Sequence, residues 1–552
     1  MDTKKLVIYA LFGFICFSLW DAWKKDYPSE KIVATQQTQT INSPGITTPT
    51  GSSVVSEKQI NQTSSKNGLV KHKLIKVQTD VLDITIDTVG GNIVQSSLLQ
   101  YPAKLHEKGP ITFFSDKSEN FYVANSSLVS NNGPDTESKL AQYTAEKSLY
   151  QLSPEQKEMQ VKLTWNNKGV VVSKVFTFVR GRYDVKVLYN IENKTKQDWK
   201  GWFSAQLQRK DVVQESTSKF QYNAFTGAAI SSNEKPYEKI TYKKLAQTQI
   251  DRDIQGGWLS LQQRYFLSVW VPENNKSYHY FSSVDTADNI YTLGLKSGDI
   301  VVPGGAAQSV GSVLYAGPEI ADNLQALSPN LKLTVDYGWL WIISIFLFWL
   351  MEKIYKVIGN WGWSIITVTV LIKIAFFKLS ETSYRSMAKM KDLAPKMSAL
   401  KERCGDDRQK LSQATMELYR KEKINPLGGC LPMIVQIPVF IGLYYVLLEA
   451  VQLRQAPFMF WIQDLSAKDP YYILPILMGL SMFLQQKLSP QSPDPMQAKM
   501  MMFLPIIFTV FFLSFPSGLV LYWLVNNCLS ILQQWYINKK QSAVNANATF
   551  KK

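Results

Sequence analysis

Lys373 carries a positive charge inside the apolar segment 362–379, and Thr369 lies one helical turn before it. An unpaired lysine at the centre of a membrane-spanning helix costs roughly 2.5–3.5 kcal/mol on insertion scales, so such residues usually face water, a partner or a substrate. A lysine near the end of a span can instead extend its stem to the membrane surface. The residue alone therefore leaves a polar cavity and a snorkelling side chain both open.

Other polar features accompany Lys373 in the apolar segments of the second half of the chain. Four prolines each free a backbone carbonyl that protein, side chains or water must satisfy. Four uncharged polar side chains are each more typical of helix–helix packing than of a site. Together with Lys373 they predict a partly hydrated interior. The prolines are Pro432, Pro438, Pro475 and Pro505, and the polar residues are Gln436, Thr509, Asn526 and Asn527.

Motifs for covalent or metal chemistry are absent from the sequence. There is no P-loop, no His-Glu-x-x-His and no Gly-x-Ser-x-Gly, and the three histidines, His72, His106 and His279, lack metal-ligand spacing. These absences disfavour an ATP-driven pump and a membrane protease. We expect no enzyme activity, no catalytic residue, no cofactor and no metal site.

Composition predicts a membrane protein with one large soluble part. The chain has 552 residues, 45% of them hydrophobic and 12% aromatic. Its four cysteines, at positions 16, 404, 430 and 528, leave residues 27–335 without any, so disulfides play no part there. The net charge of +16 lies largely beside apolar segments, where it sets orientation rather than indicating nucleic-acid binding.

The first part of the chain predicts an anchor followed by a tether. Two lysines, an uncharged stretch and then Asp21, Lys24 and Lys25 make residues 1–26 a signal anchor, and we expect it to be uncleaved because no small-x-small site follows. Residues 27–70, rich in Thr, Gln, Ser and Asn, are typical of a disordered periplasmic tether.

Residues 71–330 predict an all-β sandwich. Apolar and polar residues alternate in segments such as 81–87 and 161–165, and each segment ends at turn residues such as Gly90-Gly91. A sugar-processing activity occurs on such folds, but a fold does not imply a function and candidate catalytic residues are few.

The second half of the chain contains the apolar segments 337–351, 362–379, 427–448, 471–486 and 500–538. The last has no charged residue over 39 positions, which is enough for two spans at about 20 residues each, with a break at 515–518. A basic tail follows at 539–552.

Charge and aromatic residues predict the topology. Eleven Lys or Arg between 381 and 425 indicate a cytoplasmic loop, so only one of the segments 337–351 and 362–379 can cross. Trp339, Trp341 and Trp349 favour an interfacial amphipathic helix over 335–358. The prediction is six spans, five of them forming a helical core over 359–538, with both termini cytoplasmic and residues 27–335 periplasmic.

The loop 381–425 predicts a cytoplasmic helical hairpin around a turn at 404–407. Met387, Met390 and Met397 recur at helical spacing on the first arm, and Tyr419 belongs to a similar stripe on the second. The stripes either pack on each other or present an adaptable face to varied partners, and the sequence leaves both open.

Several long motifs resemble the YidC-type (YidC/Oxa/Alb) membrane protein insertases, in the form with a large periplasmic domain. They are Gly359-Asn-Trp-Gly-Trp-Ser364 followed by an apolar run to Lys373, Asn425-Pro-Leu-Gly-Gly-Cys430-Leu-Pro-Met433, Leu453-Arg-Gln-Ala-Pro457, Asp464-Leu-Ser-Ala-Lys-Asp-Pro470, and Phe515-Pro-Ser-Gly-Leu-Val-Leu-Tyr522. The resemblance is close over about 335–538.

The resemblance implies a five-span core around a hydrophilic groove open to the cytoplasm and to lipid. The family's positive groove residue, often arginine, corresponds to Lys373, a polar neighbour to Thr369, and an aromatic residue to Trp523 beside Tyr522. We add Gln436 and Asn526 to the groove. The implied function is insertion and folding of integral inner-membrane proteins, alone or with the Sec translocon. The implied partners are nascent membrane proteins, the lipid bilayer, the translocon with its accessory subunits, and ribosome or targeting factors at the hairpin, with no small-molecule substrate.

Two other classes compete with this interpretation. A transporter or channel using Lys373 as a substrate site predicts repeat symmetry and several charged gating residues, and the sequence has neither. A scaffold acting through its β domain is the third class.

Overall fold

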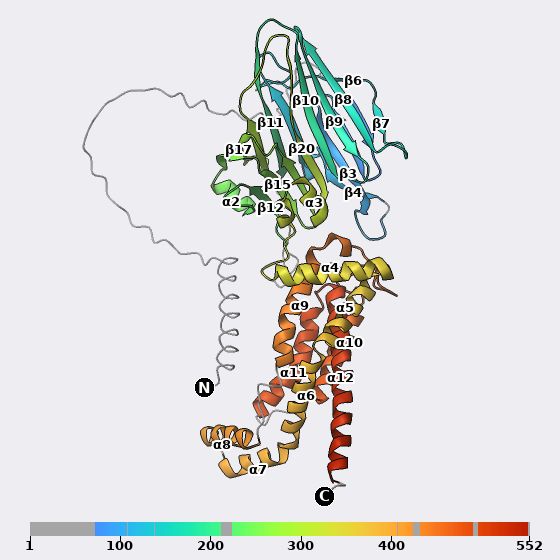
Figure 1. Cartoon of the computed structure of the whole chain (residues 1–552), viewed down its shortest axis with the longest axis vertical. Coiled ribbons are helices and arrows are strands. Elements are labelled where there is room, and N and C mark those ends of the chain that lie inside the picture. The colour runs from blue at the N-terminus through green and yellow to red at the C-terminus, as the bar shows by residue number, and fades with distance from the viewer. Residues whose placement is uncertain are drawn as a thin grey trace, which may run out of the picture. The chain divides into compact units, whose positions relative to one another are not determined.

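The structure, a computed structural model, describes residues 72–107, 109–136, 138–210, 224–405, 407–422, 431–488 and 495–549. The predicted anchor (1–26) and tether (27–70) lie outside these ranges, as do residues 423–430 at the end of the predicted hairpin. The described chain forms a β region followed by a helical region (Figure 1).

Two large, mainly antiparallel sheets form the β region and pack face to face (Figure 1). The first has 11 strands in the order β14-β17-β18-β11-β5-β3-β2-β1-β7, with β19 beside β11 and β4 beside β3. The second has nine in the order β13-β12-β15-β16-β20-β10-β9-β8-β6. The predicted β-sandwich is therefore confirmed.

The bounds of the strands and short helices in this region complete its description. The strands are β1 (Leu74–Gln78), β2 (Leu82–Asp87), β3 (Asn92–Pro102), β4 (Pro110–Phe114), β5 (Tyr122–Val129), β6 (Thr144–Ala145), β7 (Leu149–Gln151), β8 (Glu158–Asn167), β9 (Val170–Val179), β10 (Asp184–Asn193), β11 (Trp199–Lys210), β12 (Gly227–Ser231), β13 (Glu238–Ile240), β14 (Asp251–Gln255), β15 (Trp258–Gln263), β16 (Phe266–Val271), β17 (Ser277–Asp285), β18 (Ile290–Ser297), β19 (Ile300–Val302) and β20 (Ala307–Pro318). The short helices are η1 (Ser118–Asn120), α2 (Tyr242–Gln247), α3 (Ala321–Leu327) and η2 (Leu331–Thr334).

Strand β10 illustrates why these residues form a sandwich. Val185, Val187, Tyr189 and Ile191 are all buried, whereas Lys186 between them is exposed, as the period of two in a strand requires. Strand β20 pairs with β10, and the two strands approach closely at Gly311. A Cβ added at Gly311 would stand only 2.0 Å from the Val187 carbonyl oxygen. Only glycine fits that approach.

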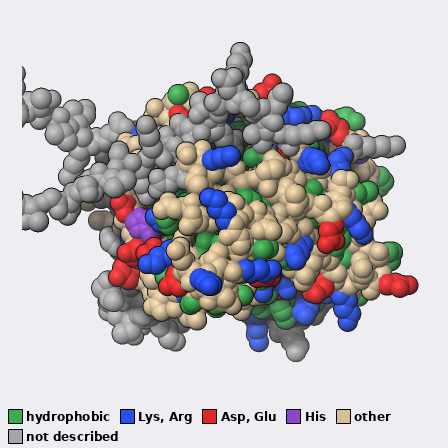
Figure 2. All heavy atoms as spheres, turned by 90° about the horizontal axis from the view of Figure 1, so that it is seen from above, with side chains coloured by type: hydrophobic (Ala, Val, Ile, Leu, Met, Phe, Trp, Pro, Cys, Tyr) green, Lys and Arg blue, Asp and Glu red, His purple; other side chains and the backbone are tan. Residues whose placement is uncertain are grey.

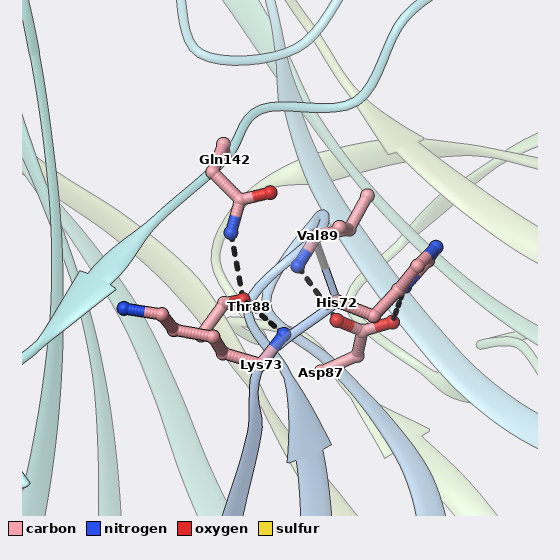
Figure 3. Close-up of polar contacts among 6 residues, drawn as sticks. All are labelled: His72, Lys73, Asp87, Thr88, Val89 and Gln142. Carbon is pink, nitrogen blue, oxygen red and sulfur yellow. Dashed lines mark hydrogen bonds and ion pairs between the residues drawn. The ribbon is translucent and has the colours of Figure 1, made fainter. Parts of the chain in front are cut away.

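The first described residues are fastened to the end of β2 by side-chain contacts (Figure 3). His72 Nδ1 lies 2.7 Å from Asp87 Oδ2, and the Lys73 backbone N–H donates to Thr88 Oγ1 at 3.3 Å. The same hydroxyl accepts from Gln142 Nε2 at 2.7 Å, which joins the loop before β6 to this end of β2. These contacts fasten residues 72 and 73 to the end of β2.

A buried lysine lies inside the sandwich. Lys174, on β9, has no exposed surface and donates from Nζ to the carbonyls of Gly90 at 3.1 Å and Ser126 at 3.0 Å. Desolvation lowers its pKa to about 7, opposed by the nearby carboxylate of Asp135. Asp135 itself accepts backbone N–H groups. The two side chains thus connect the turn at Gly90 and the segment between Asp135 and Ala141 to the strands.

One face of the molecule carries side chains of both charges. Figure 2 shows Lys and Arg side chains interspersed with Asp and Glu side chains over one face. Such a pattern is typical of a solvated surface rather than of a nucleic-acid interface.

The helical region begins with α4. Its helices are α4 (Trp341–Ile358), α5 (Trp361–Ala375), α6 (Phe377–Asp392), α7 (Ala394–Cys404), α8 (Arg408–Lys421), α9 (Leu431–Glu449), α10 (Ile473–Leu488), α11 (Pro495–Phe512) and α12 (Ser517–Thr549), with the short η4 (Val451–Leu453) after α9. Helix α12 packs against α5, α6, α9 and α10, and α4 packs against α5 and α9 (Figure 1).

The segment 362–379, predicted as one span, is divided in the structure. Helix α5 ends at Ala375, and the chain bends by 66° before α6. The bend at Phe376 was not predicted, because neither proline nor glycine stands there. Among the described helices, only α5 together with α6 up to Met390 is both long and apolar enough for a membrane span, and no single helix is. The six spans stay a prediction.

Two other predicted boundaries can be compared with the helices. Helix α4 begins at Trp341, later than the predicted 335, because Asp336, Tyr337 and Gly338 adopt a turn in which Gly338 has a φ of 69°. The gap between α11 and α12 falls at the predicted break near Pro516. There the Ser517 N–H and hydroxyl donate to Ala467 and Asp464 carbonyls, which satisfies the start of α12.

Candidate hydrophilic groove

Helix α5 carries Lys373 in its last turn. The Asn360 side chain caps the helix by accepting the Trp363 N–H at 3.1 Å, and the row Trp361, Ile365 and Val368 is buried against neighbouring helices. This burial fixes the rotation of the helix. Lys373 is therefore half-buried and directed toward α12.

Lys373 meets α12 through one hydroxyl. Its Nζ donates to Ser530 Oγ at 2.7 Å, and Ser530 donates in turn to the Asn526 carbonyl at 2.8 Å. Tyr384, on α6, also hydrogen-bonds Ser530. Within the described ranges Lys373 forms no ion pair. Its charge is held by neutral groups and is therefore left for an anion to compensate.

A second polar cluster lies one to two turns away along α12. Gln436, on α9, donates from Nε2 to Tyr522 Oη at 3.2 Å and also contacts Asn526 Oδ1. Tyr522 is 1% exposed and Asn526 is 9% exposed. The structure thus joins three of the predicted groove residues, and Asn526 connects them through its carbonyl to Ser530 and Lys373.

Thr369 and Trp523 do not join these hydrogen bonds. The Thr369 hydroxyl is buried and donates to the Ile365 carbonyl of its own helix at 2.7 Å. Trp523 lies against an aromatic cluster, with its ring centroid 4.7 Å from that of Phe440 and 5.4 Å from that of Phe512. Its Nε1 is buried and has no hydrogen-bond partner among the described residues. Both residues contribute packing beside the polar side chains.

Ser530 is the polar residue that sequence reasoning missed. Serine is common in helices, and its partner Lys373 is 157 residues away in the chain. A signal was nevertheless present, because Tyr522, Asn526 and Ser530 recur every four residues and must share one face of a helix.

The residues of the predicted hairpin lie on three helices. Met387 and Met390, on α6, are half-buried, as is Tyr419 on α8, whereas Met397 on α7 is 7% exposed. Helices α7 and α8 pack together, and Lys396 forms an ion pair with Glu422 at 2.6 Å. Burial of Met397 favours packing of the two stripes on each other.

The α8 arm begins at a regular cap and leaves an apolar residue outside. The Asp407 carboxylate accepts the N–H groups of Gln409 at 3.1 Å and Lys410 at 3.0 Å. Met416 is 56% exposed. In the hairpin, Met397 is thus buried between the helices, whereas Met416 is exposed and could adapt to a partner.

The chemistry available at these polar residues is attraction and hydrogen bonding. The residues offer one cation, two amides, a phenol and a hydroxyl, which suits transient binding of polar or acidic groups. In the described part of the chain no three His, Cys, Asp or Glu side chains gather as a metal site would require.

Comparisons with known proteins match nearly the whole chain. The family model described as the YidC periplasmic domain matches residues 74–350, and that described as the 60Kd inner membrane protein matches residues 353–544. Proteins named membrane protein insertase YidC are similar to it. The protein of Coxiella burnetii is 48% identical over 98% of this chain and 97% of its own length. The protein of Legionella pneumophila is 48% identical over 98% of this chain and 98% of its own length.

One solved structure is also similar to this chain. An active YidC insertase crystal structure with the first transmembrane domain resolved is 17% identical, covers 84% of this chain and 92% of that chain, and gives a TM-score of 0.38. The full-length identity and the two family models agree with each other and with the motifs around the groove. The chain therefore belongs to the YidC family of membrane protein insertases, and is an inner-membrane protein with a periplasmic domain.

Proposed function

We propose that this chain inserts and helps fold integral inner-membrane proteins through a hydrated groove that opens to the cytoplasm and to lipid. The groove is lined by Lys373, Gln436, Tyr522 and Asn526, to which we add Ser530. The single observation that supports it most is that Lys373 is bonded to a neutral hydroxyl and forms no ion pair within the described ranges. A charge held in this way is ready to attract an acidic group.

The physical task is the transfer of a polar tail across an apolar layer. Each backbone group without a hydrogen bond costs several kcal/mol in hydrocarbon, so a hydrated half-channel lowers the barrier by shortening the dry path. Lys373 transiently attracts acidic residues of the tail, while Gln436 and Asn526 exchange hydrogen bonds with its backbone. These residues only bind and orient the client tail, and no covalent bond forms or breaks.

The hydrophobic segment of the client leaves sideways into lipid. The half-buried rings of Trp523 and Phe440, backed by the buried Phe512, offer it an apolar wall. The Thr369 hydroxyl is engaged within its own helix and does not compete for the tail. Burial of the segment supplies the driving force, at roughly 25 cal/mol per Å² of apolar surface, so no nucleotide is needed.

Topology and partners complete the proposal. Six spans with cytoplasmic termini would put the β region in the periplasm and the α7–α8 hairpin in the cytoplasm. Met387, Met390, Met397 and Tyr419 would organise the hairpin, and its basic exterior would meet the ribosome or targeting factors. The Sec translocon and its accessory subunits would share clients with this chain.

Insertion into proteoliposomes that hold only this protein tests the proposal. A small single-span client should acquire a protease-protected fragment without ATP. A chain lacking most of 71–330 should keep substantial insertion, because the groove residues lie outside that region. Loss of all insertion in a shortened chain that still folds would instead favour a scaffold acting through the β region.

A further inference from the structure

The β region holds a cleft of about 350 Å³ at one end of the sandwich. The segment between β4 and β5, the end of β11 and the end of β15 meet there, and they contribute Lys117, Asn120, Arg209, Lys210 and Gln263 to its lining. This volume lies at the lower end of the range of small-molecule sites. None of these residues belongs to the groove.

Arg209 gives the cleft its chemistry. The side chain is 8% exposed, its guanidinium carbon stands 4.8 Å from the centre of the Tyr122 ring, and Nη2 donates to Gln263 Oε1 at 2.7 Å. Its Nη1 is buried and has no hydrogen-bond partner among the described residues. A guanidinium that is held by a ring and one amide, with Nη1 unpaired among the described residues, has a donor that a planar oxyanion would satisfy.

The surrounding charges favour an anion too. Lys117, Arg209 and Lys210 outnumber Asp116 in the lining, and within the described ranges none of the four takes part in an ion pair. Lys210 Nζ is directed to the Ser118 carbonyl at 3.3 Å, which fixes it beside the cleft. The cleft thus has a net positive charge with one acidic group at its edge.

We propose that this cleft binds the carboxylate of an acidic side chain on an extended peptide segment, with Arg209 as the principal contact. A carboxylate matches the guanidinium plane, and the mixed lining of Phe121, Tyr122 and Asn120 suits the hydrocarbon and amide parts of a peptide. The inference concerns a site outside the groove and does not depend on how the groove works.

The test uses the full chain in lipid nanodiscs and a fluorescent, extended peptide of glycine and serine with one central glutamate. A matched peptide with glutamine in its place is the neutral probe. We expect the glutamate peptide to bind at least about 10-fold more tightly, a ratio typical of a charge-assisted hydrogen bond. Arg209→Gln should abolish that preference, and Arg182→Gln, at an exposed arginine paired with Asp184, should leave it unchanged.

Further arms separate the outcomes. Because Arg209 also contacts Tyr122 and Gln263, Lys117→Gln provides a variant at a lining charge with no ion pair in the described part, and it should weaken the glutamate peptide alone by about threefold. Equal binding of the two peptides by the natural chain would overturn the proposal. Glutarate competing as well as the peptide would overturn the assignment to a peptide, and phosphate competing better than glutarate would overturn the assignment to a carboxylate.

Discussion

Replacing Lys373 by glutamine removes the charge at the end of α5 while keeping a polar, uncharged side chain at that position. Lys373 Nζ lies 2.7 Å from Ser530 Oγ, and no carboxylate pairs with it in the described part of the chain. The charge is therefore available to an acidic client residue. Hydrogen bonds to charged groups contribute about 1.5–3 kcal/mol. At 1.4 kcal/mol per factor of ten, the initial insertion rate of a client with an acidic translocated tail should fall by about 10- to 100-fold.

The assay compares paired clients in proteoliposomes. One client carries Asp and Glu in its translocated tail, and the other carries Asn and Gln at the same positions. Lys373→Gln should slow the acidic client and leave the neutral one nearly unchanged, whereas Lys373→Arg should restore the acidic client. Lys378→Gln, at an exposed position five residues further on, is the matched control and should behave like the natural chain. An equal loss for both clients would refute charge attraction and indicate a packing role for Lys373.

Three further predictions concern stability and the hairpin. Because burial lowers the pKa of Lys174 to about 7, the folded chain binds fewer protons than the unfolded chain above that pH, so the free energy of unfolding in urea should rise between about pH 7 and pH 9. Lys174→Met should flatten that rise, and an unchanged pH profile would show that the lysine is charged when buried. Asp469, 1% exposed, accepts the Trp461 indole N–H and two backbone N–H groups at the start of α10, so Asp469→Ala should destabilise the helical region by about 2–4 kcal/mol in denaturant titrations. Met397→Asp should separate α7 from α8 and increase proteolysis of the hairpin, whereas Met416→Asp at an exposed position should not.

The β region was predictable because its signal is local. Alternation in strands such as β10 has a period that only a half-buried strand explains, and turn residues such as Gly90, with a φ of 72°, divide one strand from the next. The order of the strands in the two sheets was not predictable. Pairings such as β5 with β11 join segments far apart in the chain, and no single sequence records them.

The sequence singled out polar residues that the structure brings together, but not their contacts. Lys373 stood out because a charged side chain in an apolar segment has a high free-energy cost. Ser530 did not stand out, because an uncharged serine has a much smaller cost there. Whether Trp523 faces the polar groups or the aromatic cluster depends on the rotation of α12, which packing against four other helices sets.

The bend at Phe376 limits how much of a bilayer α5 can cross. With 15 residues at 1.5 Å each, the helix is about 22 Å long, against roughly 30 Å for the hydrocarbon core of a typical bilayer. A straight apolar stretch this short is accommodated by local thinning of the membrane. We therefore expect lipid beside Lys373 to be compressed, so that the bilayer itself, and not only the protein, presents a client tail with a thinner barrier.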